Sequence, residues 1–323
     1  MLASSSEPLW YDFTMSRIDV HHHFVPPSYL RRERERVLAA MALNPALLTE
    51  WTPARAVEEL DRHDIARAVV SISTPGIWFG EPEAARTLAR ECNEYAAQMA
   101  RDHPGRFGNF AAIPLPDVEG SLREIAHAYD VLGADGVGIL TSYDDRWPGD
   151  PAFAAVFDEL NRRRAVVFVH PTAPTCCRNL IPGVPAPMTE FLFDTTRAIT
   201  SLLFSGTVAR CPEIRFIFCH GGGTMTVLAH RIGTFANRHP ELFPRGLRAE
   251  LERFSYDLAN TTNEPAFSAL RSLIPVSQLL FGSDYPYLPV GATTGGFAGL
   301  GLGPETLQAI EYDNAVRLFG PRT

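Results

Sequence analysis

Short apolar runs and longer helical patterns alternate along the chain, and this alternation constrains the fold more than any other feature. The runs are rich in Val, Ile and Phe, as β-strands are, and each is followed by a segment with the period of an α-helix. Eight strands are predicted in this way, at residues 17–20, 66–72, 107–113, 136–140, 165–170, 214–220, 254–258 and 278–283. Strands that alternate with helices pair in parallel, so the sequence predicts an α/β fold with a parallel sheet.

The helical segments carry start signals that agree with this prediction. They occupy residues 52–63, 81–103, 119–132, 150–163, 190–210, 223–237, 264–273 and 304–319. Pro53, Pro82, Pro151 and Pro265 fall in predicted first turns, where proline is tolerated. Eight strand–helix cycles in 323 residues match a (β/α)8 TIM barrel, and a doubly wound open sheet is the alternative.

Metal-binding residue types stand at the ends of these predicted strands. His21 and His23 end the first strand two positions apart, and side chains two positions apart in a strand share one face. His170, His220 and Asp284 close the fifth, sixth and eighth strands. The carboxyl ends of barrel strands converge at one mouth, whereas an open sheet would hold these residues far apart, so the barrel is favoured. Imidazoles and a carboxylate gathered there suit a divalent metal.

Each later member of this set also has an ordinary structural explanation. His170 follows the apolar run 166–169 and could be a hydrogen-bonded core histidine. His220 precedes the glycine run 221–223, which could form a turn in which only the glycines matter, or open a helix N-terminus toward an anion. Asp284 could cap the turn that follows it. Their common position at strand ends favours the metal site.

One domain is predicted. Residues 1–16 form a leader that we expect to be disordered or packed on the surface, without the basic and apolar regions of a secretory signal. Residues 17–323 form a single barrel domain, because neither an internal repeat nor a break in composition marks a second one. The stretch at about 26–51, with charged residues at 31–36, is interpreted as a loop–helix insertion after the first strand.

All 29 basic residues are arginine, and the chain contains no lysine. A bias toward arginine codons explains this composition, yet its chemical consequence holds. Schiff-base catalysis requires a lysine amine, and the bridge between two metals in many barrel hydrolases is a carbamylated lysine. Around the predicted fourth strand, no carboxylate replaces that lysine before Asp144 and Asp145. The site is therefore expected to hold one metal.

The charge and cysteine content indicate which partners and which cellular compartment to expect. The formal net charge of −8 argues against a nucleic-acid partner, and no apolar run approaches the ~18 residues of a membrane span. The five cysteines are odd in number and lack the spacing of a zinc knuckle. We therefore expect free thiols, including the adjacent Cys176 and Cys177, and a cytoplasmic location.

Four motifs together resemble a known family. They lie at residues 18–23 (IDVHHH), 168–171 (FVHP), 219–222 (CHGG) and 282–286 (GSDYP). This set is similar to the amidohydrolase-related barrels that include aminocarboxymuconate semialdehyde decarboxylase. Within that group the chain most resembles the 6-methylsalicylate decarboxylase type, at residues 21–27 (HHHFVPP), 93–97 (NEYAA), 132–137 (LGADGV) and 205–208 (SGTV). The resemblance covers most of residues 17–319.

The resemblance implies a metal site and a reaction. His21, His23, His170 and Asp284 would hold one divalent metal per chain, with zinc expected first and manganese second, and His220 would act beside it as an acid/base. The enzyme would be a carbon–carbon lyase, a non-oxidative decarboxylase. Its substrate would be a small carboxylic acid, an ortho-hydroxybenzoate such as 6-methylsalicylate or a related unsaturated acid. Related barrels are often dimers, so a homodimer is expected.

Position alone leaves the catalytic proton donor open. A proton must reach the ring carbon that bears the carboxylate, and either Asp284 or His220 could deliver it. A water on the metal, activated by His220, is another route. Asp284 is thus a candidate ligand, a candidate catalytic acid, or both.

Aromatic side chains near strand ends are candidates for binding the substrate ring, although packing is their more common role. The candidates are Phe24 after the first strand, Trp78 and Phe79 after the second, and Tyr285 and Tyr287 after the eighth. Arg146 and Arg178 lie in predicted mouth loops and could pair with a carboxylate, but a surface position explains both more simply.

The sequence is compatible with three functions. The decarboxylase is the leading prediction. A mononuclear metal site can also activate water against a lactone or amide, so a hydrolase is the alternative. A barrel that binds a metal or ligand without turnover, its mouth closed by the insertion, is the third. Product analysis separates them, since decarboxylation alone releases carbon dioxide.

Overall fold

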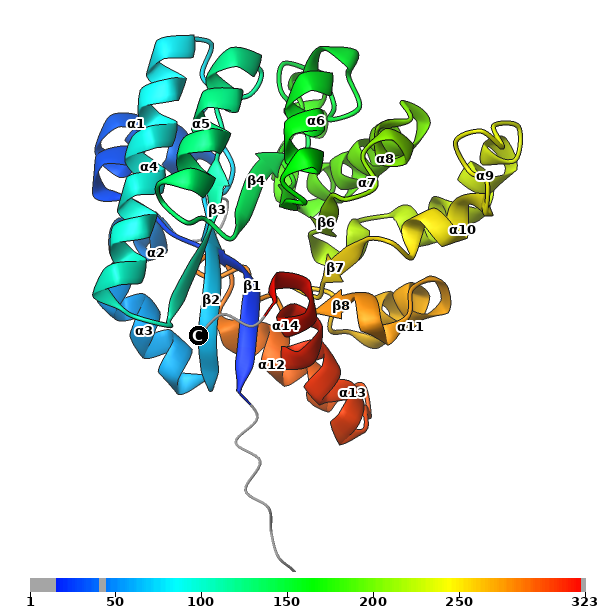
Figure 1. Cartoon of the computed structure of the whole chain (residues 1–323). Helices are drawn as coiled ribbons and strands as arrows, with labels where there is room; N and C mark the ends of the chain where they lie inside the picture. The colour runs from blue at the N-terminus through cyan, green and yellow to red at the C-terminus, as the bar shows by residue number, and fades with distance from the viewer. Residues whose placement is uncertain (1–15, 41–44, 321–323) are drawn as a thin grey trace, which may run out of the picture.

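Eight parallel strands form the centre of the molecule (Figure 1). The structure, a computed structural model, describes residues 16–40 and 45–320. Neighbouring strands follow the order of the chain, and each pair is parallel. The strands are β1 (Arg17–His23), β2 (Ile65–Ser71), β3 (Phe107–Ala112), β4 (Gly136–Leu140), β5 (Val166–His170), β6 (Arg215–Phe218), β7 (Ser255–Asp257) and β8 (Leu279–Leu280).

The sheet closes on itself between its first and last strands. Beyond β8 the chain continues beside β1, where the backbone N of His23 donates to Tyr285 O at 2.7 Å. In return, the backbone N of Asp284 donates to His21 O, also at 2.7 Å. The predicted (β/α)8 barrel is therefore confirmed, and the open sheet is excluded.

Helices surround the barrel (Figure 1). The longer ones are α3 (Pro53–Arg62), α4 (Pro82–Asp102), α5 (Val118–Asp130), α6 (Ala154–Arg162), α7 (Glu190–Phe204), α9 (Met225–Ala236), α11 (Glu264–Leu273) and α12 (Val290–Ala298). The shorter ones are α8 (Thr207–Arg210), α10 (Gly246–Leu251), α13 (Pro304–Gln308) and α14 (Asn314–Phe319). Thr52, Asp117 and Asn263 each cap a helix by accepting a hydrogen bond from the backbone N three residues later.

Some predicted helices differ from the structure. The helix predicted at 190–210 ends at Phe204, because the chain turns through Gly206, whose φ is +75°, before α8 begins. The helix predicted at 304–319 consists of α13, a π-helical turn η6 (Ala309–Asp313) and α14. The sequence did not predict α10 or α12. The glycines of α12 are poor helix formers, which removed its helical signal.

The insertion after β1 contains two helices, α1 (Pro27–Ala40) and α2 (Pro45–Thr49). In Figure 1 α1 lies behind α4, and Arg32 of α1 pairs with Glu91 of α4 at 3.0 Å. Residues 1–15, which make up nearly all of the predicted leader, lie outside the described residues, as do residues 41–44.

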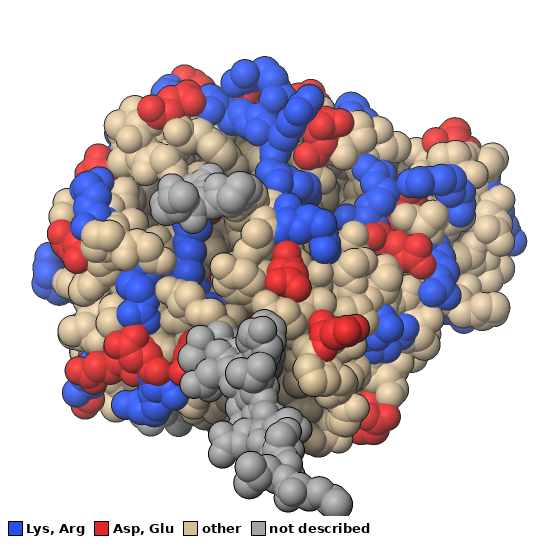
Figure 2. Space-filling model, turned by 60° about the horizontal axis from the view of Figure 1, so that its bottom comes forward, with Lys and Arg blue, Asp and Glu red and all other residues tan. Residues whose placement is uncertain are grey.

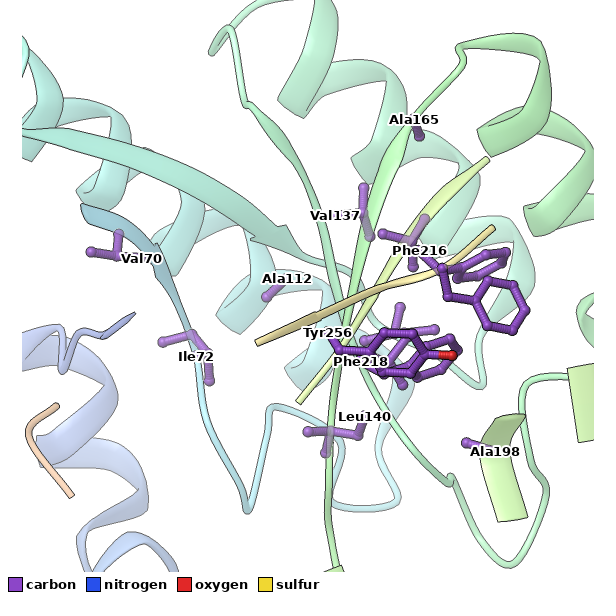
Figure 3. Packing of buried hydrophobic residues seen from close by; sticks show 14 of the residues in the cluster. Val70, Ile72, Ala112, Val137, Leu140, Ala165, Ala198, Phe216, Phe218 and Tyr256 are labelled. Carbon is purple, nitrogen blue, oxygen red and sulfur yellow. The ribbon is translucent and has the colours of Figure 1, made fainter. Parts of the chain in front are cut away.

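Two apolar layers hold the barrel together. Inside it, Phe110 stacks on Phe168 with ring centroids 4.9 Å apart. Phe168 and His170 share this inward face, because side chains two positions apart in a strand do. Outside it, strand residues such as Phe216 share one cluster with helix residues such as Ala198 (Figure 3). The inner layer thus ends at His170, where polar side chains replace apolar ones.

Charged side chains of both signs are intermixed on the face shown in Figure 2. Some of the charged side chains of the chain form close ion pairs, as Arg163 does with Asp130 at 2.7 Å. Within residues 16–40 and 45–320, no helix combines the length and apolar character needed to cross a membrane.

Candidate metal centre and adjoining cavity

Four possible ligands meet at the mouth of the barrel. His21 and His23 come from β1, His170 ends β5, and Asp284 lies just after β8. One nitrogen or oxygen atom from each lies within 4.8 Å of the others. The structure thus brings together the four residues expected from the sequence to hold a metal.

A bulge in β1 turns His21 and His23 toward the barrel interior. The register of β1 on β2 shifts between Asp19 and His22. Within the shift, Val20 packs in the inner apolar cluster, and the rings of His21 and His23 lie together with centroids 4.9 Å apart. In a regular strand Val20 and His21 would face opposite sides. The bulge therefore lets both residue types face inward.

Hydrogen bonds at Nδ1 assign the tautomers of these histidines. His21 Nδ1 donates to Asp257 Oδ2 at 3.0 Å, and His23 Nδ1 donates to Ser71 O at 3.2 Å. Each Nε2 lone pair then faces the centre of the cluster, where the two Nε2 atoms lie 3.0 Å apart. Asp284 Oδ1 lies 3.1 Å from His23 Nε2. Acceptors this close repel one another unless a proton or cation lies among them, so these residues fit a metal ion.

Burial and neighbouring charges prepare the cluster for a cation. Burial lowers the pKa of His23, and lowers that of His170 well below its ordinary value, so both are neutral. Burial also acts to lower the pKa of His21, but the negative charges around the ring, that of Asp257 first, together with the hydrogen bond to Asp257 outweigh it, and the pKa is raised well above the ordinary value. Burial acts to raise the pKa of Asp284, but the charge of His21 and the hydrogen bonds to the neighbouring histidines together outweigh it and hold the pKa well below the ordinary value.

His220 stands beside the cluster in η4 (His220–Gly222). Its Nε2 lies 3.3 Å from Asp284 Oδ2, and its backbone N donates to Asp257 Oδ1 at 3.2 Å. The backbone φ is +53° at His220 and +62° at Asp284, in the left-handed region that costs roughly 1–2 kcal/mol for residues other than glycine. Such strain gathers at functional sites, and here it places two candidate proton donors side by side.

A cavity of about 380 Å³ adjoins His170, His220 and Asp284. Its other polar lining residues are Ser73, Thr74, Asn260 and Tyr287, and its apolar ones are Ala40, Pro185, Pro187, Met188, Phe191, Leu192 and Leu288. None of the lining residues in the described part of the chain is arginine or lysine. A ligand carboxylate in this cavity would therefore need an ion held by the four candidate metal ligands as its positive partner.

Four of the five aromatic candidates from the sequence, Phe24, Trp78, Phe79 and Tyr285, lie outside the set that lines this cavity. Their partners are the ring of Tyr95 for Phe24, the Asp144 carboxylate for Trp78, the Arg36 guanidinium for Phe79 and the ring of His22 for Tyr285. Tyr287, the fifth candidate, lines the cavity together with Phe191, which was not predicted, while Arg146 and Arg178 are not among its described lining residues. Substrate contact by the four aromatic residues stays a prediction.

Three supporting residues were not predicted from the sequence. Asp257, fully buried at the end of β7, holds the ring of His21. Ser71 O accepts from His23, and Ser73 Oγ lies 3.4 Å from His170 Nε2. A signal for Asp257 existed, since it is a carboxylate at the carboxyl end of the predicted strand 254–258. Serine is common at strand ends, so the two serines gave no comparable signal.

One protein family matches almost the whole chain. Residues 18–320 match the Amidohydrolase family, and the chain belongs to it. It is 35% identical to decarboxylase yanB of Aspergillus niger, over 94% of this chain and 88% of that protein. It is 36% identical to the 6-methylsalicylic acid decarboxylase acuB of Aspergillus aculeatus, over 84% and 85% of the two chains. The fold also matches the crystal structure of a dihydroxybenzoic acid decarboxylase from Polaromonas, which holds manganese and the inhibitor 2-nitroresorcinol. The TM-score is 0.80 and the sequence identity 19%, over 94% of this chain and 96% of that chain.

Proposed function

We propose that the chain is a metal-dependent, non-oxidative decarboxylase of an ortho-hydroxybenzoate such as 6-methylsalicylate. The observation that carries this proposal is the cluster of three histidines and Asp284 beside a largely apolar cavity. The substrate class is supported by the 36% identity to a 6-methylsalicylic acid decarboxylase. The reaction breaks a carbon–carbon bond and needs no oxidant.

The cavity wall favours a ring that carries an apolar substituent. Pro185, Met188 and Leu192 offer apolar surface to a ring and its methyl group. A second hydroxyl against this wall would lack a hydrogen-bond partner, which costs ~1–3 kcal/mol. We therefore expect kcat/KM for 6-methylsalicylate to exceed that for 2,6-dihydroxybenzoate by roughly 10-fold.

The metal would be held by His21, His23, His170 and Asp284. When bound, it supplies Lewis acidity toward the phenolate and carboxylate oxygens of the substrate. Three imidazoles and one carboxylate suit zinc, our first expectation, and also manganese, which the related Polaromonas structure holds. We expect about one ion per chain.

The protein's own side chains would deliver the proton. Asp284 Oδ2 and His220 Nε2 lie 3.3 Å apart and both residues line the cavity, so a proton can pass between them. The acid protonates the ring carbon that bears the carboxylate. The carbon–carbon bond then breaks, its electron pair restores the aromatic ring, and carbon dioxide leaves. The apolar wall assists, because it favours neutral carbon dioxide over the charged carboxylate.

Metal analysis paired with a carbon dioxide assay tests this function. We expect 6-methylsalicylate to release carbon dioxide, a chelator to stop the release, and zinc or manganese to restore it. His220→Gln separates the proton donors, because it retains all four ligands: a fall in kcat of about 10²–10⁴-fold with normal metal content assigns the proton to His220. Hydrolysis of a lactone or amide without carbon dioxide would favour the hydrolase, and a chain that holds no metal would contradict both.

We also propose that the chain forms a homodimer in the cytoplasm. A groove of about 710 Å³ lies along α7 and α9, lined partly by Phe193 and Leu228. Phe235, which also lines the groove, is 48% exposed, and Val227, next to Leu228 in the chain, is 78% exposed. A second copy suits this face, since a two-fold interface needs a projecting apolar surface and a matching hollow on the same face. The five free cysteines support a reducing compartment.

Sedimentation measures the oligomeric state. We expect a mass of twice the 35.6 kDa chain, and we expect Phe235→Asp to shift it toward the monomer. A wild-type monomer at micromolar concentration would contradict the dimer.

A further inference from the structure

We infer that Asp19 is a positioning residue that holds metal ligands from two strands in place. The inference rests on the proposed function, because it concerns the same metal site. Asp19 lies in β1, has no exposed surface, and is not one of the four candidate ligands. A buried carboxylate is costly unless its oxygens are fully hydrogen-bonded, so its partners show what it does.

Four hydrogen bonds reach the Asp19 carboxylate. Oδ1 accepts from the backbone N of His21 and the backbone N of Ser283, each at 3.0 Å. Oδ2 accepts from His22 Nδ1 at 3.0 Å and from Ser283 Oγ at 2.5 Å. This number matches the roughly four lone-pair sites of a carboxylate. Two donors belong to β1 and two to the turn after β8, so one side chain clamps both segments.

The Asp19 carboxylate lies where the regular pairing of β1 with its neighbouring strands is interrupted. His21 falls within the register shift of β1, and its backbone N donates to Asp19. On the other segment, Ser283 immediately precedes Asp284, whose backbone is left-handed. His21 Nε2 and Asp284 Oδ1 lie 3.3 Å apart. The Asp19 carboxylate therefore fixes the backbone next to two ligands that are far apart in sequence.

This role differs from that of Asp257. Asp257 holds the ring of His21 and thereby its tautomer, whereas Asp19 holds the backbone on which that ring is mounted. Without Asp19 the two segments would keep their backbone hydrogen bonds, such as that from Asp284 N to His21 O, but would lose the side chain that holds the bulge against Ser283. The distance between the two ligands would then be less tightly fixed.

Metal affinity measured without substrate tests the inference. Wild type, Asp19→Ala and Asp19→Asn are titrated with Mn²⁺ in competition with a chelating dye, and the melting temperature of each metal-free protein is recorded. Asp19→Ala leaves the backbone N–H groups of His21 and Ser283 without their acceptor, and we expect the Kd for Mn²⁺ to rise about 10–100-fold. Asp19→Asn keeps an acceptor for both, and its amide can donate to Ser283 Oγ and His22 Nδ1. We expect it to recover most of the affinity.

Asp135→Ala is the matched control. The Asp135 carboxylate is also buried and accepts from Arg67 at 2.7 Å and from the backbone N of Asn109 at 2.9 Å, near the start of β4. It is expected to lower the melting temperature without changing the Kd for Mn²⁺. If Asp19→Ala lowers the melting temperature but binds Mn²⁺ as tightly as wild type, the inference is overturned. If Asp19→Ala does not fold, Ser283→Ala takes its place: weaker Mn²⁺ binding supports the inference and unchanged Mn²⁺ binding overturns it. A wild-type protein that does not bind Mn²⁺ would instead overturn the proposed function.

Discussion

At the scale of single residues, one buried carboxylate determines which ring nitrogen of a histidine in this site carries the proton. Burial would raise the pKa of Asp257, but the charge of His21 and the hydrogen bonds from His21 and His220 together outweigh it and lower that pKa, so Asp257 is an anion that accepts a hydrogen bond from Nδ1 of His21. Asp257→Asn offers an amide that can instead donate to Nδ1, which would put the proton on Nε2. We expect metal affinity and kcat/KM to fall about 10–100-fold.

A dye competition assay measures this loss, with Asp194→Asn as the control. Asp194 is a buried carboxylate that accepts from Thr141, Ser142 and Trp147 rather than from a ligand. Equal metal affinity in Asp257→Asn and wild type would show that the tautomer of His21 does not depend on Asp257.

The raised pKa of His21 predicts a pH dependence of metal binding. At neutral pH the metal-free cluster carries a proton on His21, while His23 and His170 are neutral. The ion must displace that proton, so binding should release about one proton and the affinity should rise about tenfold per pH unit below the pKa of His21. Calorimetry in two buffers with different ionisation enthalpies counts the protons. No release at pH 7 would mean that His21 is already neutral.

At the level of the element, the turn after β6 sets the position of His220. Gly223 has a φ of +66°, and a Cβ there would lie 2.2 Å from the backbone O of Leu192. Gly223→Ala combines left-handed strain with overpacking and should lower the free energy of unfolding by roughly 2–5 kcal/mol. It should also lower kcat, because His220 moves with the turn.

Gly246→Ala provides the comparison for thermal or denaturant unfolding. Its φ is +82°, but no atom lies within 4 Å of the added Cβ. It should cost only the strain, roughly 1–2 kcal/mol, and leave kcat unchanged. If both variants lose the same stability and activity, contact with Leu192 does not constrain the turn.

The strands, and the gathering of the candidate ligands at their ends, could be predicted from the sequence because apolar residues give way to polar ones where each strand ends. A barrel strand covered by helices is buried on both faces, so Val166–His170 appears in the sequence as an apolar run that ends in a histidine. The bulge was not predictable, since no local pattern tells whether Val20 or His21 faces the interior. The strand predicted at 278–283 is regular only over Leu279–Leu280, because the following residues bend toward the Asp19 carboxylate.

The cavity wall was the least predictable part of the site. Phe24 and Trp78 stand near strand ends, as the sequence indicated, yet Phe191 and Leu192 line the cavity. These two residues begin α7, after the long loop that follows β5. The path of such a loop depends on tertiary contacts rather than on periodicity, so these two cavity residues could not be predicted from the sequence, although Tyr287 was.

For the whole molecule, the candidate metal site lies where the barrel closes. Its ligands come from β1, from β5 on the opposite side of the strand order, and from the turn after β8 that completes the ring. An ion that binds all of them binds the folded chain and not the unfolded one. At a metal concentration 100 times the Kd this contributes about 2.7 kcal/mol, which for 323 residues corresponds to a rise of about 4 °C in melting temperature.

Scanning calorimetry with metal and with a chelator measures this rise. His170→Ala is the control, because it removes the only ligand from β5 and leaves β1 and the β8 turn connected by their backbone hydrogen bonds. We expect its melting temperature to respond much less to metal than that of wild type. If wild type melts at the same temperature with and without metal, the ion does not join the strands of the barrel, and the four residues would have to be explained as a proton-sharing cluster instead.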